Sequence, residues 1–166
     1  KRLKKLGFNI KYFKNVITSG EVIHEELNYP SLSWSKKLGN NYYYISNNSN
    51  IKNDSLIKDL KKNRVNKIEK ADFILGSTVN SNISVIDYLP LFKEGLKNNI
   101  PFICANPDYE SVETNSSNNK VICMGTLGKL YESFGGKVHL LGKPSKYIFD
   151  KAILSLGKIK KSRTIV

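Results

Sequence analysis

Lys143 stands in the short run Gly142-Lys143-Pro144-Ser145, which follows an apolar run at 138–141 and precedes a helical pattern. The glycine and the proline bound a stiff turn, and the positive end of the following helix adds to the field of the lysine ammonium group. A turn of this kind fixes one cation against an anion and predicts a phosphate site. These four residues alone leave a second interpretation open, in which Lys143 is one surface lysine among many.

A second polar group, Asn106-Pro107-Asp108, follows the apolar run 101–105 directly. Pro107 restrains the turn, while Asn106 and Asp108 supply an amide and a carboxylate. Open α/β sheets gather their ligand groups at the carboxyl ends of strands, so this position is suitable for substrate binding. A tight turn selects the same residue types for conformational reasons, and this alternative also stays open.

Other residues with reactive side chains give weaker indications. His24 and His139 have no acidic or cysteine partner at metal-ligand spacing, and we predict that neither is catalytic. Cys104 and Cys123 lack a CxxC spacing, so we expect two buried thiols rather than a zinc site or a disulfide. We therefore predict no metal ligands within this chain.

Apolar strands alternate with amphipathic helices along most of the chain, which predicts the α/β class with a largely parallel sheet. Thr18 and Glu21 resemble a capping box at the start of a helix that ends near Pro30. The three tyrosines Tyr42–Tyr44 favour packing in a strand over a stacking platform for bases. Strands are predicted at 15–17, 42–45, 71–75, 101–105, 120–123, 138–141 and 164–166, and helices at 1–6, 18–28, 55–62, 85–98, 126–134 and 145–156.

The 166-residue chain has a formal net charge of +13, concentrated at its two ends. Residues 1–14 contain six basic residues and no acidic one, and residues 143–166 contain seven basic residues against Asp150. Nucleic-acid binding is a less favoured prediction, because only three of the basic residues are arginines. No stretch approaches the length of a membrane span, and no secretory leader is visible, so we expect no membrane partner and a cytoplasmic location.

Several motifs in register resemble the haloacid dehalogenase-like (HAD) phosphatases of subfamily IIA, most closely a branch of hypothetical proteins. Each motif by itself is unspecific, but together they extend over nearly the whole chain. The motifs are Ile17–Glu21, Ala71–Leu75, Ile103–Asp108, Cys123–Leu127, Tyr131-Glu132, Gly135–Val138, Leu141–Pro144 and Ile148-Phe149.

The resemblance implies Rossmann-type core pieces that flank an inserted α/β cap domain of the C2 type. Residues 1–28 and 138–166 would be core segments, and residues 29–137 would be the cap. Lys143 matches the lysine that holds the phosphoryl group in the family. Asn106, Pro107 and Asp108 match the motif that leads into a substrate-specificity loop, here about 109–122, and the implied substrate is a phosphorylated small molecule.

The family also needs an Asp-x-Asp pair, which supplies the nucleophile and the general acid/base, and further acidic ligands for Mg²⁺. This chain contains no Asp-x-Asp. We therefore expect a fragment of a Mg²⁺-dependent phosphatase that is inactive alone. The alternative is a non-catalytic module that docks on another polypeptide, such as the missing core segments as a separate chain or a second copy of itself.

Overall fold

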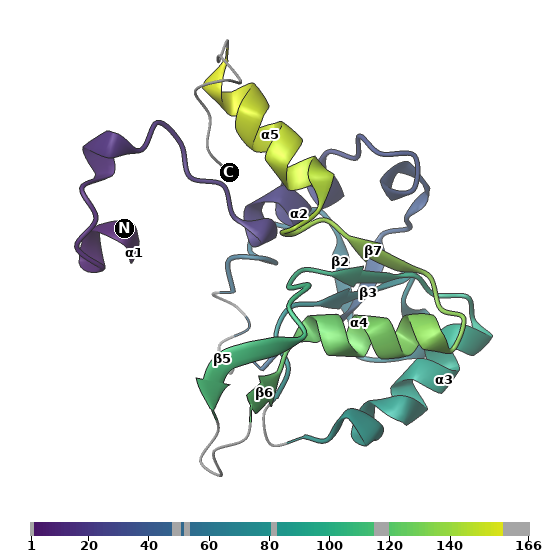
Figure 1. Cartoon of the computed structure of the whole chain (residues 1–166). Helices are drawn as coiled ribbons and strands as arrows, with labels where there is room; N and C mark the ends of the chain where they lie inside the picture. Colours follow the sequence, from purple (N-terminus) through teal and green to yellow (C-terminus); the bar gives the residue numbers. More distant parts are fainter. Residues whose placement is uncertain (1, 48–50, 52–53, 81–82, 115–119, 158–166) are drawn as a thin grey trace.

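The computed structural model describes residues 2–47, 51, 54–80, 83–114 and 120–157. Its centre is a parallel sheet of five strands in the order β2-β1-β3-β4-β7, which confirms the predicted α/β class (Figure 1). The strands are β1 (Asn41–Ile45), β2 (Asn63–Val65), β3 (Phe73–Gly76), β4 (Phe102–Cys104) and β7 (Val138–Leu140).

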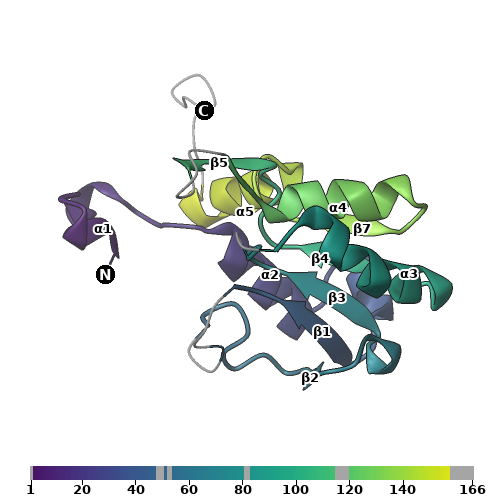
Figure 2. The same cartoon turned by 90° about the horizontal axis from the view of Figure 1, so that it is seen from below.

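Helices cover both faces of this sheet. On one face lies α2 (Ser19–Asn28), with α5 (Lys146–Leu156) beside it, and on the other lie α3 (Leu89–Lys97) and α4 (Met124–Ser133) (Figures 1 and 2). The segment that contains α1 (Arg2–Lys5) reaches away from this body in both views. Short 3-10 turns are η1 (Ile10–Tyr12), η2 (Ser35–Lys37), η4 (Ile68–Lys70) and η5 (Val85–Tyr88).

The central strands are buried on both faces, as in a parallel sheet covered by helices on each side. Phe73, Leu75 and Ile103 contribute to a core with α2, whereas Ile74 and Phe102 contribute to the core under α3 and α4. All five side chains are fully buried. This two-sided burial explains why these segments read as continuous apolar runs rather than as alternating ones.

Helix α2 begins as its sequence predicts. The Thr18 hydroxyl accepts a hydrogen bond from the Glu21 N–H (3.2 Å), and the Glu21 carboxylate accepts one from the Thr18 N–H (2.9 Å). This capping box satisfies two backbone donors that would otherwise lack partners. The helix ends at Asn28, before Pro30.

The predicted helix at 55–62 is wrong. Residues 55–59 form turns, and the strand β2 follows them. The Asp54 side chain accepts from the Leu56 N–H, its carbonyl accepts from the N–H groups of two later residues, and Asp59 has a φ of 61°. A left-handed residue ends a helical turn, so the local hydrogen bonds to Asp54 and the conformation of Asp59 decide this segment.

Three strand predictions remain to be compared with the structure. Residues 15–17 are not part of a strand. The segment at 120–123 does form a strand, β6 (Lys120–Ile122), but it pairs antiparallel with β5 (Glu110–Thr114) in a separate two-stranded sheet. The predicted strand at 164–166 lies outside the described residues.

The sheet contains elements from both sides of the expected domain boundaries. β7 pairs with β4, although the sequence assigned 138–166 to a core segment, and α2 packs on the same sheet although it was assigned with 1–28. Elements from both sides of these boundaries therefore pack together. The domain organisation, with boundaries at 28 and 138, stays a prediction.

Candidate functional site

A cavity of about 380 Å³ lies at the carboxyl end of β4. Three segments far apart in the sequence line it, and every site residue predicted from the sequence is among them. The lining residues are Ile17, Thr18, Ser19, Gly20, Ala105, Asn106, Pro107, Asp108 and Lys143. The structure therefore brings Lys143 and the Asn106-Pro107-Asp108 turn to one place.

The turn after β4 is fixed to the sheet and to α4. The Ala105 N–H donates to the Gly76 carbonyl (2.8 Å), and the Gly125 N–H donates to the Asp108 carbonyl (3.0 Å). A Cβ on Gly125 would lie 2.2 Å from the carbonyl oxygen of Pro107, so only glycine allows α4 to start this close to the turn. These contacts hold Asn106 and Asp108 at the cavity.

Lys143 reaches the cavity from a turn that contacts the other two segments. Its N–H donates to the Ser19 hydroxyl (3.3 Å), and the Ser145 N–H donates to the Gly142 carbonyl (2.8 Å). A Cβ on Gly142 would lie 2.7 Å from the Ser19 hydroxyl oxygen and 3.0 Å from Cδ of Pro107. The three lining segments therefore meet at Gly142 without space for a side chain.

Sequence reasoning did not identify Ser19 as a cavity residue, because Thr18-Ser19-Gly20 also reads as an ordinary helix start. The contact that places Ser19 at the cavity exists only in the folded chain. Ser19 contacts a residue 124 positions later in the chain, and no local pattern encodes that contact.

A buried carboxylate ties α2 to α5, the helix that follows Lys143. Glu26 is 1% exposed, and its carboxylate accepts hydrogen bonds from Ser31, Leu32, Ser35 and the Tyr147 hydroxyl. Burial alone would raise the pKa of Glu26, but these hydrogen bonds outweigh it and lower the pKa to about 2. Glu26 is therefore ionised at neutral pH and holds Tyr147 of α5 against α2.

The cavity suits a small anion better than a metal ion. Among its lining residues Lys143 is the one cation and Asp108 the one carboxylate, accompanied by the hydroxyls of Thr18 and Ser19. In the part of the chain that the structure describes, no three His, Cys, Asp or Glu side chains gather in a metal-binding group. Mg²⁺ takes octahedral oxygen ligands, usually including one or two carboxylates, and the cavity lining offers Asp108 alone.

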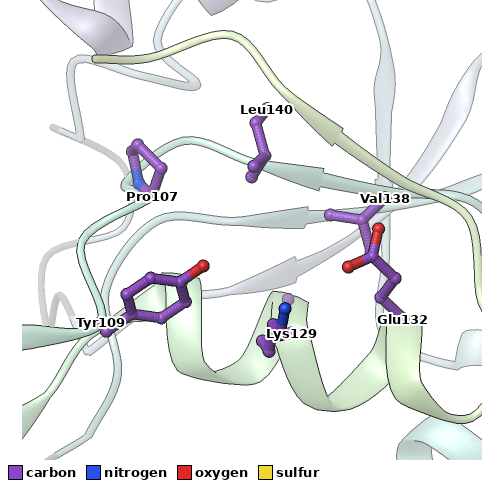
Figure 3. Close-up of a pocket in the computed structure, with 8 residues that line it drawn as sticks. Pro107, Tyr109, Lys129, Glu132, Val138 and Leu140 are labelled. Carbon is purple, nitrogen blue, oxygen red and sulfur yellow. The ribbon is translucent and has the colours of Figure 1, made fainter. Parts of the chain in front are cut away.

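A smaller cavity of about 50 Å³ lies on the other side of Pro107. Pro107 and Tyr109 border it from the turn after β4, Val138 and Leu140 from β7, and α4 borders it with Lys129 and Glu132 (Figure 3). The volume is about that of one or two water molecules. Pro107 thus forms a wall between two spaces, and only the larger one contains Lys143.

Neither histidine lines the larger cavity. The His24 ring bonds to the Leu56 carbonyl (3.0 Å) and to the Asn28 side chain (2.9 Å). The His139 ring stacks on Trp34 with its centroid 4.0 Å away, and burial, with a smaller contribution from Lys137, lowers the pKa of His139 to about 4. His139 is therefore neutral at physiological pH.

The two cysteines differ in their surroundings and do not form a disulfide. Cys104 is buried as expected, and burial raises the pKa of its thiol to about 12. A thiol with this pKa does not act as a nucleophile at neutral pH. Cys123 is only partly buried, so the expectation of two buried thiols holds for Cys104 alone.

None of the helices in the described ranges is long and apolar enough to cross a membrane.

No protein-family model matches the chain, and no curated protein matches it either. Solved structures of low sequence identity share its fold. A haloacid dehalogenase-like hydrolase from Brucella suis is 22% identical with a TM-score of 0.76, over 98% of this chain and 57% of its own. A possible sugar phosphatase of the HAD superfamily from Cytophaga hutchinsonii is 21% identical with a TM-score of 0.67, over 96% and 56%.

A third similar structure is a glycerol phosphate phosphatase from Mycobacterium tuberculosis in complex with calcium, which is 14% identical with a TM-score of 0.62 over 93% of this chain and 42% of its own. The chain therefore spans about half the length of the solved structures that it matches. Its fold is that of a part of HAD-like hydrolases and phosphatases.

Replacing Gly142 by alanine should loosen the contact of the three lining segments. The added Cβ has to displace Ser19 or Pro107, and overpacking of this kind costs about 1–3 kcal/mol of unfolding free energy, measurable by urea titration. Gly20→Ala is the matched control, because the nearest atom to its Cβ is 3.9 Å away in the Leu56 side chain. Equal stability of the two variants would contradict the tight packing at Gly142.

The ionised state of Glu26 should make the protein lose stability in acid. Its pKa is lowered from 4.5 to about 2, so its contribution is complete above pH 4.5 and disappears as the pH falls towards 2. Glu26→Gln should lower the unfolding free energy at pH 7 by about 2–3 kcal/mol and should flatten this acid dependence.

The neighbouring Glu25→Gln is the control for this change. The Glu25 side chain is 57% exposed and pairs with Lys151 at 2.6 Å, and an exposed ion pair contributes at most about 1 kcal/mol. Urea unfolding at pH 7 and pH 3 compares the variants. If Glu25→Gln lowered the unfolding free energy as much as Glu26→Gln does, the buried carboxylate would not be the main contact that holds α5 on α2.

Proposed function

We propose that this chain, which has the fold of a part of the HAD-like hydrolases, is the portion of a phosphatase that holds the phosphoryl group of a small phosphate ester. The observation that carries the proposal is the cavity that Lys143 shares with Asn106, Pro107 and Asp108. The one cation, the two hydroxyl residues and the polar turn of this cavity suit the capture of the phosphoryl group, which is the first step of phosphate-ester hydrolysis.

Phosphoryl transfer requires positive charge around the anion and a nucleophile in line with the leaving oxygen. In the proposed mechanism the Lys143 ammonium group binds phosphoryl oxygens, and Asn106 and Asp108 contact the alcohol part of the substrate. The nucleophile belongs to an Asp-x-Asp pair that this sequence does not contain. The isolated chain is then inactive, and phosphate transfer to an aspartate occurs only in a longer or assembled protein.

A magnesium ion is part of the proposal for the assembled protein. It would offset the negative charges of the phosphoryl group and of the nucleophile, and carboxylates outside this chain would hold it. The glycerol phosphate phosphatase with this fold has been solved with calcium and with magnesium, which supports a divalent cation. A phosphorylated small molecule as substrate is supported by the names of that protein and of the possible sugar phosphatase. We also propose a cytoplasmic location.

A second candidate function is a module that docks on another polypeptide. Apolar side chains are exposed on the N-terminal segment, including Phe8, Ile10 and Tyr12, and on α5, including Ile153 and Leu154. Basic residues are concentrated in the same two regions. Both features suit an acidic partner protein that carries the aspartates of the site. Binding of nucleic acid to these basic regions is the less supported alternative.

Inorganic phosphate should bind at Lys143. Titration with phosphate should shift the backbone amide signals of Ser19 and Lys143 in ¹⁵N NMR spectra, and Lys143→Ala should weaken binding by about fivefold or more, because it removes the one cation of the cavity. The control is Lys146→Ala, three residues away, whose ammonium group pairs with Asp150 at 2.6 Å. Equal weakening by both variants would indicate binding to general surface charge and would contradict the site.

The same preparations test the expected inactivity. With p-nitrophenyl phosphate and Mg²⁺ we expect no turnover from the chain alone. Turnover that Lys143→Ala abolishes would overturn the proposal that the site is incomplete.

Co-expression with a HAD-type core segment that contains an Asp-x-Asp pair tests the docking function. The two polypeptides should co-elute and gain phosphatase activity, and Leu154→Asp should weaken the association by about tenfold, since it puts a charge into an apolar contact. Leu140→Asp is the control, since Leu140 is exposed on β7 rather than on α5. Absence of association would contradict the docking function.

A further inference from the structure

The strand order of the main sheet identifies a second place where a ligand can bind. β1 has β2 on one side and β3 on the other, and all later strands continue on the β3 side. The connections that follow β1 and β3 therefore diverge at the carboxyl ends of these two strands. In open parallel sheets of this order, the crevice at that divergence is the usual position of a bound small molecule.

A cavity of about 360 Å³ lies at this place. The end of β1 lines it with Tyr43 to Ser46, the connection after β3 with Asn80 and Ile83, and η5 and α3 complete it with Asp87, Tyr88 and Leu91. It shares no lining residue with the cavity at Lys143. Its volume is within the range of small-molecule sites.

Contacts with the hydrophobic core hold the aromatic side chains of this cavity in place. The Tyr88 ring stacks on the buried Phe92 ring with centroids 6.2 Å apart. Tyr43 packs on the same core, under α3 and α4, whereas Tyr44 packs on the opposite face of the sheet, where its hydroxyl donates to the Asp54 carboxylate at 2.7 Å. Tyr43 and Tyr88 are therefore preorganised, which lowers the entropic cost of binding a ligand against them.

The charge of this cavity is opposite to that of the protein as a whole. Asp87 is the one charged side chain among the described residues that line it, although the chain carries +13. Asp87 accepts one hydrogen bond, from the Ser84 N–H at 2.9 Å, and a carboxylate has further lone pairs to offer a ligand. Tyrosine faces add a preference for cations, because the ring quadrupole is negative on its face.

We propose that this cavity, which we name the tyrosine crevice, binds a small organic cation: an amine with an aromatic or aliphatic body. The ammonium group pairs with Asp87 and the body lies between the tyrosine rings and the apolar side chains of Ile83 and Leu91. A phosphate or carboxylate ligand is disfavoured, since the described residues that line the crevice offer it a carboxylate and no basic side chain. The inference does not depend on the proposed phosphatase function.

Three probes of similar shape and different charge test the proposal on the unmodified chain. Phenethylamine is a cation, 2-phenylethanol is neutral and 3-phenylpropionate is an anion. In ¹⁵N NMR titrations up to about 10 mM, phenethylamine should shift amide signals at the end of β1 and in η5, with an affinity about fivefold or more above that of 2-phenylethanol. The anion should not shift these signals.

Asp87→Asn separates the charge of Asp87 from its structural contact, because the amide oxygen still accepts from the Ser84 N–H. This variant should weaken phenethylamine binding by about fivefold and change 2-phenylethanol binding by less than about twofold. Asp150→Asn is the control, since it removes the same charge from α5, outside the crevice.

The proposal is overturned if phenethylamine causes no shift at the end of β1 or in η5, or if the anion binds as well as the cation. An unchanged phenethylamine affinity in Asp87→Asn overturns it as well. The comparison of the three probes uses the unmodified chain, so it tests the proposal even if the Asp87→Asn variant does not fold.

Discussion

Parallel pairing of five strands is the constraint on which the other features depend. It places the carboxyl end of every strand at one edge of the sheet, and the cavities of about 380 Å³ and 360 Å³ lie along that edge. The cavity at the end of β4 contains Lys143, and the tyrosine crevice at β1 and β3 contains Asp87. One edge of the sheet thus carries two separate cavities: Lys143 and Asp108 line the first, and Asp87 is the one charged residue among the described residues that line the second.

A buried anion and its donors connect α2 to α5, the helix that follows Lys143. Glu26 of α2 is ionised, and it accepts from Tyr147 of α5 as well as from the 31–35 segment. A buried carboxylate is costly unless hydrogen bonds satisfy it, so the three parts have to stay together. Because α5 directly follows the Lys143 turn, the same network that stabilises α2 also orients the cation of the cavity.

Local signals in the sequence were sufficient where neighbouring residues decide the structure. Thr18 and Glu21 predicted the start of α2, and the apolar runs predicted β3 and β4, because caps and two-sided burial depend on residue types within a few positions. The helix expected at 55–62 failed because hydrogen bonds to Asp54 and the left-handed Asp59 replace the helical ladder. The strand β6 was predicted, but its antiparallel pairing with β5 was missed, because the many Ser and Asn residues of the 109–122 segment indicate a loop.

By itself, the sequence determined the α/β class, the candidate residues Lys143, Asn106, Pro107 and Asp108, and the absence of an Asp-x-Asp pair. Only the tertiary structure decided that these residues share one cavity, that Ser19 borders it, and that Asp87 and the tyrosines form a second one. The physical reason is that residue types and short spacings fix local conformation and chemistry. Which strand ends meet depends on the order of strands in the sheet, and pairings such as Asn41 with Asn63 and Phe102 with Val138, between residues far apart in the sequence, set that order.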